Sequence, residues 1–259
     1  MTVDRNLWSA GLRKTYAPRW LCPSCSNGTL RLIPDSLRWV ETAESQRRHG
    51  DEDFNIYDID YTFSGSLECG GCRQRISCCG WGGEEPYTFQ NEDGDWEQEY
   101  EKVFYPQFFY TFLQLFCPPS RCPRPVREQL YKSFAVFFCD LSAAANHLRQ
   151  CVEEILTHAG IDIRDAKGGF IHLNDRIKIY EGRDSDNAER ITALKWIGNC
   201  GSHPEDDLKK PDLFDAYDIL ELLLEDLYVG HNRNVRNIVA QINAAKGPRR
   251  QGGAGGSQR

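Results

Sequence analysis

Upstream of a proline-rich stretch, the chain contains short runs in which hydrophobic and polar positions alternate. Threonine, isoleucine, tyrosine and phenylalanine recur at every second position, and turn-forming residues separate the runs. A side-chain repeat of two is typical of strands that bury one face. The pattern predicts strands at residues 29–33, 36–42, 54–69 and 73–81.

Downstream of that stretch, "CPPSRCPRP" at residues 117–125, apolar residues recur in steps of three and four. Neither a helix nor a strand continues easily through four prolines, so the stretch separates the two patterns. Pro125 suits the first turn of a helix, and Gly160 can end one. We therefore predict one long helix with an apolar face made of Val126, Leu130, Phe134, Phe137, Leu141, Ala144, Leu148, Val152, Ile155 and Leu156.

Further helices are predicted along the rest of the chain. A short one covers residues 172–180, Asp186 can cap the next, Pro211 begins a fourth, and a fifth spans residues 232–244. Together they form a bundle of four or five helices. Its predicted core consists of Leu130, Phe134, Phe137, Leu141, Leu148, Ile155, Leu194, Ile197, Leu220, Leu223 and Leu227.

The net charge of the chain limits which classes of macromolecule it can bind. With 31 Lys and Arg against 38 Asp and Glu, the formal net charge is −7, which makes duplex DNA an unlikely partner. Acidic residues concentrate at 84–101, which we interpret as a solvated loop. No apolar run approaches the ~20 residues that cross a bilayer, and no apolar leader is evident. We expect a cytoplasmic protein with no membrane partner.

Cysteine is abundant, with eleven residues. In a reducing compartment, closely spaced cysteine pairs indicate metal binding rather than disulfides. Cys22 and Cys25 form one C-x-x-C pair, and Cys69 and Cys72 form another. Two such turns can direct four thiolates at one tetrahedral zinc ion. Because four thiolates leave no open position, this zinc would be structural.

The other cysteines fit a metal site less well. Cys78 and Cys79 lie just beyond the second pair and could replace one of its ligands. The rest lack metal-binding spacing, and free cysteine packs readily in protein cores. We interpret these as packing residues: Cys117, Cys122, Cys139, Cys151 and Cys200.

Four features in this order resemble one bacterial family. They are the cysteine-rich ribbon, a connector "YPQFFYTFLQLFCPP", a helix with "LRQCVEEIL", and a later helix that ends in "IGNCGSH". The family is domain of unknown function 4145, and the resemblance covers roughly residues 20–230. Members are often fused to, or encoded near, restriction and other anti-phage systems. The family is similar to the HEPN helical bundles, whose active members are metal-independent ribonucleases.

The resemblance implies a fold class and a division into domains. We expect an α+β protein in which a small β-rich, zinc-ribbon-like N-terminal domain precedes an all-α HEPN-like helical bundle. Residues 1–118 would form the ribbon with an inserted hairpin and a connector. Residues 119–246 would form the bundle, and residues 247–259, rich in glycine, would form a disordered tail.

The resemblance also implies a candidate site. Active HEPN proteins use an Arg followed a few residues later by a His, which act on the ribose hydroxyl and the scissile phosphate. His203 matches that histidine and Asn199 matches the Asn after the arginine, but Gly198 occupies the arginine position. Arg149 and Glu153 match the family's "LRR-x-x-E" pattern.

These four residues allow three interpretations. Arg149, Glu153, Asn199 and His203 could form a polar lock between two helices, a binding site for RNA or a nucleotide, or a catalytic site. We favour a non-catalytic binding or adaptor protein with structural zinc, acting as a homodimer or with a protein partner, and associated with anti-phage defence or restriction. The alternative is a metal-independent HEPN-type ribonuclease that uses His203 and Arg149.

Overall fold

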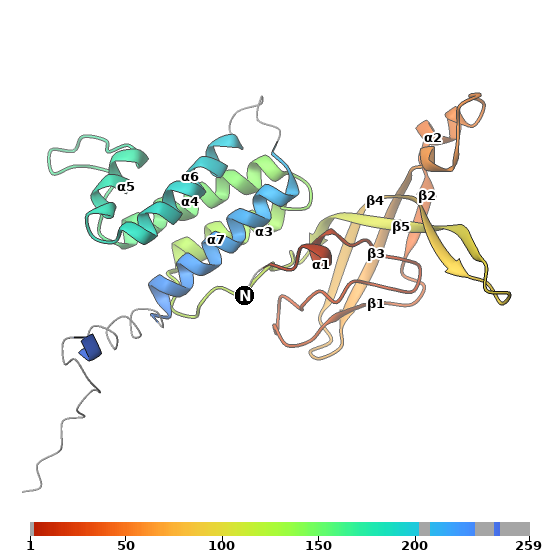
Figure 1. The fold of residues 1–259 in the computed structure, drawn as a ribbon, viewed down its shortest axis with the longest axis horizontal. Helices are drawn as coiled ribbons and strands as arrows, with labels where there is room; N and C mark the ends of the chain where they lie inside the picture. Colours follow the sequence, from red (N-terminus) through yellow and green to blue (C-terminus); the bar gives the residue numbers. More distant parts are fainter. Residues whose placement is uncertain (1–2, 202–207, 231–240, 244–259) are drawn as a thin grey trace, which may run out of the picture.

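The computed structural model describes residues 3–201, 208–230 and 241–243 (Figure 1). It has a mixed α+β architecture. An antiparallel sheet forms the N-terminal half, and helices form the C-terminal half. Among the described residues, no helix combines the length and the apolar character that would let it span a membrane.

The sheet has five antiparallel strands in which β3 pairs with three others. β1 and β2 pair with opposite ends of β3 along one edge, and β4 pairs along its other edge and then with β5. Burial alternates along β3, as its sequence pattern predicts. The strands are β1 Leu30–Leu32, β2 Arg38–Glu41, β3 Tyr61–Cys69, β4 Arg75–Gln90 and β5 Trp96–Tyr110.

Short helical segments precede or interrupt the strands. They are α1 Arg5–Ser9, α2 Ala43–Arg48 and the 3-10 helix η1 Ile56–Asp58. The strand predicted from residue 54 begins only at Tyr61. Asn55 caps η1 instead, and its backbone amide donates to the Asp58 carboxylate in a reciprocal capping box.

The interpretation of residues 84–101 as a loop is wrong. Strands β4 and β5 extend through most of this segment as a hairpin that projects away from the helices (Figure 1). Aromatic residues alternate with the carboxylates and form cross-strand contacts. The segment therefore has the two-residue repeat of a strand although it is rich in acidic residues. The Glu84 carboxylate also accepts hydrogen bonds from Tyr61 and Lys102. Most of the distal side chains remain exposed.

The single long helix predicted from Pro125 is two helices. The first ends at Val136, and Asp140 begins the second because its side chain accepts a hydrogen bond from the Ala143 amide (2.8 Å) and caps the new helix. The helix that Asp186 is predicted to cap, Ser185–Cys200, is instead capped by Asp184. The predicted fifth helix falls almost entirely outside the described residues. The helices are α3 Arg124–Val136, α4 Leu141–His158, α5 Leu173–Glu181, α6 Ser185–Cys200 and α7 Lys210–Tyr228.

The helical core lies around α4, which contacts the other four helices. Most of the predicted core residues are fully buried, while Leu141, Ile197 and Leu227 are partly buried against the same cluster. One buried polar network joins three helices. The Ser133 hydroxyl donates to the Ala144 carbonyl and hydrogen-bonds the Tyr217 hydroxyl at 2.7 Å.

Aromatic residues connect the sheet to the helices. Phe138, just after α3, contacts Trp8 from the N-terminal helix and Phe109 from β5, with ring centroids 6.2 and 5.0 Å apart. Arg5 forms an ion pair with Asp218 of α7. The two halves therefore share one continuous apolar cluster.

Candidate functional sites

The four predicted metal ligands converge at one end of the sheet. Cys22 and Cys25 lie in the turn before β1, and Cys69 and Cys72 lie in the turn between β3 and β4. All four sulfurs lie within 4.8 Å of one another. The Sγ atoms of Cys22 and Cys72 are 3.6 Å apart, and those of Cys25 and Cys69 are 3.7 Å apart. We call this group the four-cysteine cluster.

The two turns have the same backbone geometry. In each, the amide directly after the second cysteine donates to the carbonyl of the first, over 2.8 Å from Ser26 and 3.1 Å from Arg73. Both donors have a positive φ, 55° and 63°, which is uncommon for residues other than glycine. Gly28 completes the first turn, because a Cβ there would lie 2.4 Å from the Cys69 sulfur.

Backbone amides point at two of the four sulfurs and favour the thiolate form there. The Gly28 amide donates to Cys25 at 3.4 Å, and the Gly71 and Cys72 amides donate to Cys69. Hydrogen bonds from the Asn27 and Gly28 amides lower the pKa of Cys25 to about 6. The pKa of Cys69 is also lowered, mainly by the Cys72 amide.

The donor set and the spacing fit a tetrahedral metal ion such as zinc. Four sulfurs bound about 2.3 Å from one tetrahedral ion lie about 3.8 Å from one another. Cys78 and Cys79 are not part of the cluster. Burial raises the pKa of Cys78 to about 12, and its thiol points at the Gly65 carbonyl, 3.6 Å away.

The predicted helical site is only partly described. Arg149 and Glu153 lie one turn apart on α4, with 3.6 Å between the Arg149 Nε and a Glu153 carboxylate oxygen. Asn199 lies in the last turn of α6 and is half-buried. His203 lies outside the described residues. The convergence of all four side chains therefore stays a prediction.

Gly198 explains the close approach of the two helices. A Cβ at this position would lie 2.5 Å from the Arg149 Cβ and 3.1 Å from the Ala145 carbonyl oxygen. Real Cβ atoms do not come that close to other atoms, so α6 can cross α4 here only with glycine. The crossing also places Arg149 beside the end of α6.

Sequence reasoning missed three residues of this region. The Lys195 ammonium of α6 donates to the Asn174 side-chain oxygen of α5 at 2.6 Å. The same nitrogen lies 3.7 Å from the centroid of the Trp196 ring. A Lys-Trp pair on an amphipathic helix has no distinctive sequence signal, because its partners come from other helices.

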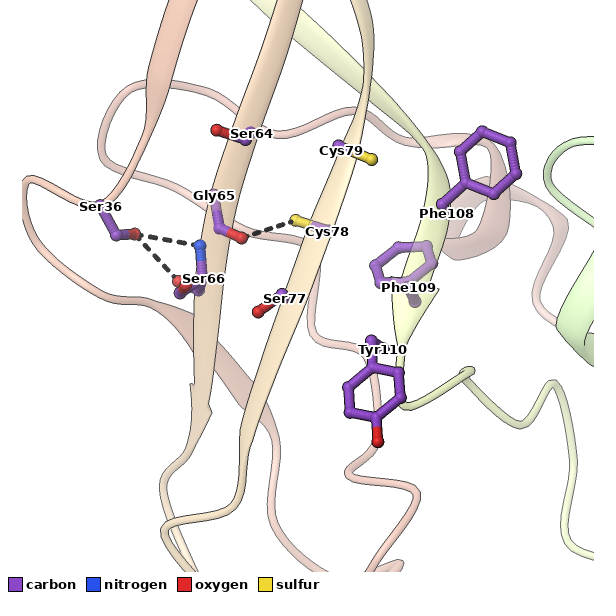
Figure 2. A pocket seen from close by; sticks show the side chains of 10 residues that line it. All are labelled: Ser36, Ser64, Gly65, Ser66, Ser77, Cys78, Cys79, Phe108, Phe109 and Tyr110. Atoms are coloured by element: carbon purple, nitrogen blue, oxygen red, sulfur yellow. Dashed lines mark hydrogen bonds between the residues drawn. The ribbon is translucent and has the colours of Figure 1, made fainter.

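A shallow groove lies across the sheet (Figure 2). It has a volume of about 440 Å³ and is lined by serine hydroxyls and by Phe108 and Tyr110 of β5. Ser36 fixes its rim, since its hydroxyl donates to the Ser66 carbonyl and accepts from the Ser66 amide. No carboxylate, amine or imidazole lines the groove.

Comparison with protein families gives two matches, one in the sheet half of the chain and one in the helical half. Residues 132–245 match the family model described as Domain of unknown function (DUF4145). This match confirms the DUF4145 resemblance for the helical half alone, and it includes Arg149, Lys195 and Gly198. Residues 10–109 match a second model, Domain of unknown function (DUF8608), which includes the whole four-cysteine cluster. No curated protein and no solved structure matches the chain.

Proposed function

We propose that the chain is a non-catalytic binding or adaptor protein. In this proposal a structural zinc ion stabilises a ribbon-like N-terminal domain, and a HEPN-like helical domain binds the ligand or partner. The observation that supports it best is the tight contact at Gly198, which leaves no room for an arginine side chain at this position of α6.

The zinc would support the fold and take no part in a reaction. Cys22, Cys25, Cys69 and Cys72 supply four sulfurs at near-tetrahedral spacing, so no position remains for water or substrate. The amide hydrogen bonds to Cys25 and Cys69 favour the thiolate form that binds metal.

The helical domain lacks part of the HEPN catalytic set. A ribonuclease of that type needs a cation from the late helix to stabilise the charge that develops on the phosphate. Gly198 has no side chain to supply it at the position of the catalytic arginine. Lys195 of the same helix already donates to Asn174, and Arg149, the nearest cation on α4, faces the Glu153 carboxylate. The same region retains cationic and aromatic side chains, which suits binding.

The biological context of the proposal rests on resemblance. Proteins with DUF4145-like domains occur beside restriction and anti-phage systems, where an adaptor would act as a homodimer or with a protein partner. RNA or a nucleotide is the ligand class that the helical domain would take.

A cleavage assay distinguishes the proposal from its alternative. End-labelled single-stranded RNA is incubated with the full chain and a chelator, and intact RNA is quantified over time. We expect the RNA to stay intact. Metal-independent cleavage that His203→Ala and Arg149→Gln abolish would replace the proposal with the ribonuclease.

A further inference from the structure

Arg149 contains a buried donor that has no acceptor among the described residues. Its Nε is enclosed, and no hydrogen-bond partner from the described part of the chain reaches it. The Glu153 oxygen lies 3.6 Å away, beyond the 2.7–3.2 Å typical of an N–H···O bond. Buried N–H groups nearly always have a partner, so an enclosed guanidinium N–H without one indicates a missing acceptor.

Lys195 places a second cation in the same region. The residue is only 6% exposed, and the Asn174 oxygen is a neutral acceptor for its ammonium. Burial lowers the pKa of Lys195, and the positive charge of Arg149 lowers it further. The positive charges of Arg149 and Lys195 therefore repel each other. A bound anion would relieve their repulsion.

Trp196 adds an exposed aromatic surface beside these cations. The Lys195 ammonium lies 3.7 Å from its ring centroid, yet Trp196 is 58% exposed. A large aromatic side chain exposed next to cations is the combination that binds nucleotides, since bases stack on aromatic rings while cations hold the phosphate.

We propose that Arg149, Lys195 and Trp196 form a nucleotide site on the α4–α6 face, with the phosphate between the two cations and the base on the indole. The site deepens the proposed function and rests on it, because it assumes binding without cleavage. A guanidinium can bind two phosphate oxygens through paired N–H groups. Asn174 keeps the Lys195 ammonium in place.

The test titrates the full chain with adenosine 5′-monophosphate, inorganic phosphate and adenosine by calorimetry. We expect the monophosphate to bind more tightly than inorganic phosphate, and adenosine to bind at least tenfold more weakly. Arg149→Gln and Lys195→Met should each weaken monophosphate binding at least tenfold. Trp196→Ala should weaken monophosphate binding and leave inorganic phosphate binding unchanged. Lys178→Met, at an exposed lysine of α5, is the matched control and should bind like the wild type.

Several results would overturn the inference. They are a folded wild type that binds no monophosphate, a Trp196→Ala variant with full affinity, or Lys178→Met weakening binding as much as Lys195→Met. Trp196 is exposed, so its variant reports on binding even if a Lys195 variant fails to fold. RNA cleavage by the wild type contradicts the proposed function instead. If the wild type neither binds the nucleotide nor cleaves RNA, only this inference is overturned.

Discussion

The four-cysteine cluster and the α4–α6 face differ in how completely their polar groups are satisfied. Around the cysteines, backbone amides donate to Cys25 and Cys69, and the four sulfurs enclose a single point. On the α4–α6 face, the Arg149 Nε is enclosed and has no acceptor in the part of the chain that the structure describes, and a second cation lies nearby. In our proposals, one metal ion completes the first region and an anion completes the second.

This difference implies that the four-cysteine cluster acts on the stability of the fold, whereas the α4–α6 face acts on ligand binding. A closed ligand set holds two turns of the sheet together and contributes to folding, as structural zinc sites do. Two cations that repel each other lower the stability of the folded protein, and binding of an anion would restore that stability. Variants of the two regions should therefore change different measurements.

The largest expected effect is the loss of the metal. Cys72→Ser, or treatment with a chelator, removes one ligand or the ion and releases the two turns from each other. Loss of a structural metal is among the few changes that cost more than about 4 kcal/mol of unfolding free energy. We expect the sheet to unfold at a lower denaturant concentration than in the wild type, and circular dichroism measures this unfolding.

Cys139→Ser is the control for that experiment, since Cys139 is an exposed cysteine outside the cluster. It should change the midpoint little. Equal midpoints for wild type and Cys72→Ser, with and without chelator, would show that the cluster stabilises nothing.

The next effect tests the helix crossing. Gly198→Ala forces a Cβ against Arg149 and Ala145, and overpacking of this kind costs about 1–3 kcal/mol despite the better helix propensity of alanine. Gly182→Ala is the matched control, because its Cβ would have ordinary contacts from 3.7 Å. Denaturant unfolding that ranks the two variants in the opposite order would refute the close contact.

The smallest effect is a pH dependence at Lys195. Its folded pKa is lowered, so the folded state disfavours the charged amine, and this penalty is fully present at neutral pH. As pH rises through the lowered pKa towards 10.5, the penalty disappears. The stability of the wild type relative to Lys195→Met should therefore increase over that interval. A difference that stays constant with pH would mean that Lys195 is not perturbed.

The sequence predicts the two regions unequally. The C-x-x-C spacing defines the four-cysteine cluster because each pair lies within one turn, and apolar periodicity places most of the helical core. Local caps are harder to predict: Asp140 divides one apolar pattern into two helices, since capping competes with periodicity. The α4–α6 face depends on tertiary packing, which brings Lys195 beside Arg149 although no motif links them. The acidic hairpin was missed because its charge obscured its aromatic alternation.

Native mass spectrometry of the full chain with adenosine 5′-monophosphate tests the division between the two regions most directly. The wild type should carry one zinc ion per chain and add one nucleotide. Arg149→Gln should keep the zinc and lose the nucleotide. A wild-type chain without zinc, or an Arg149→Gln variant that keeps the nucleotide, would contradict the account.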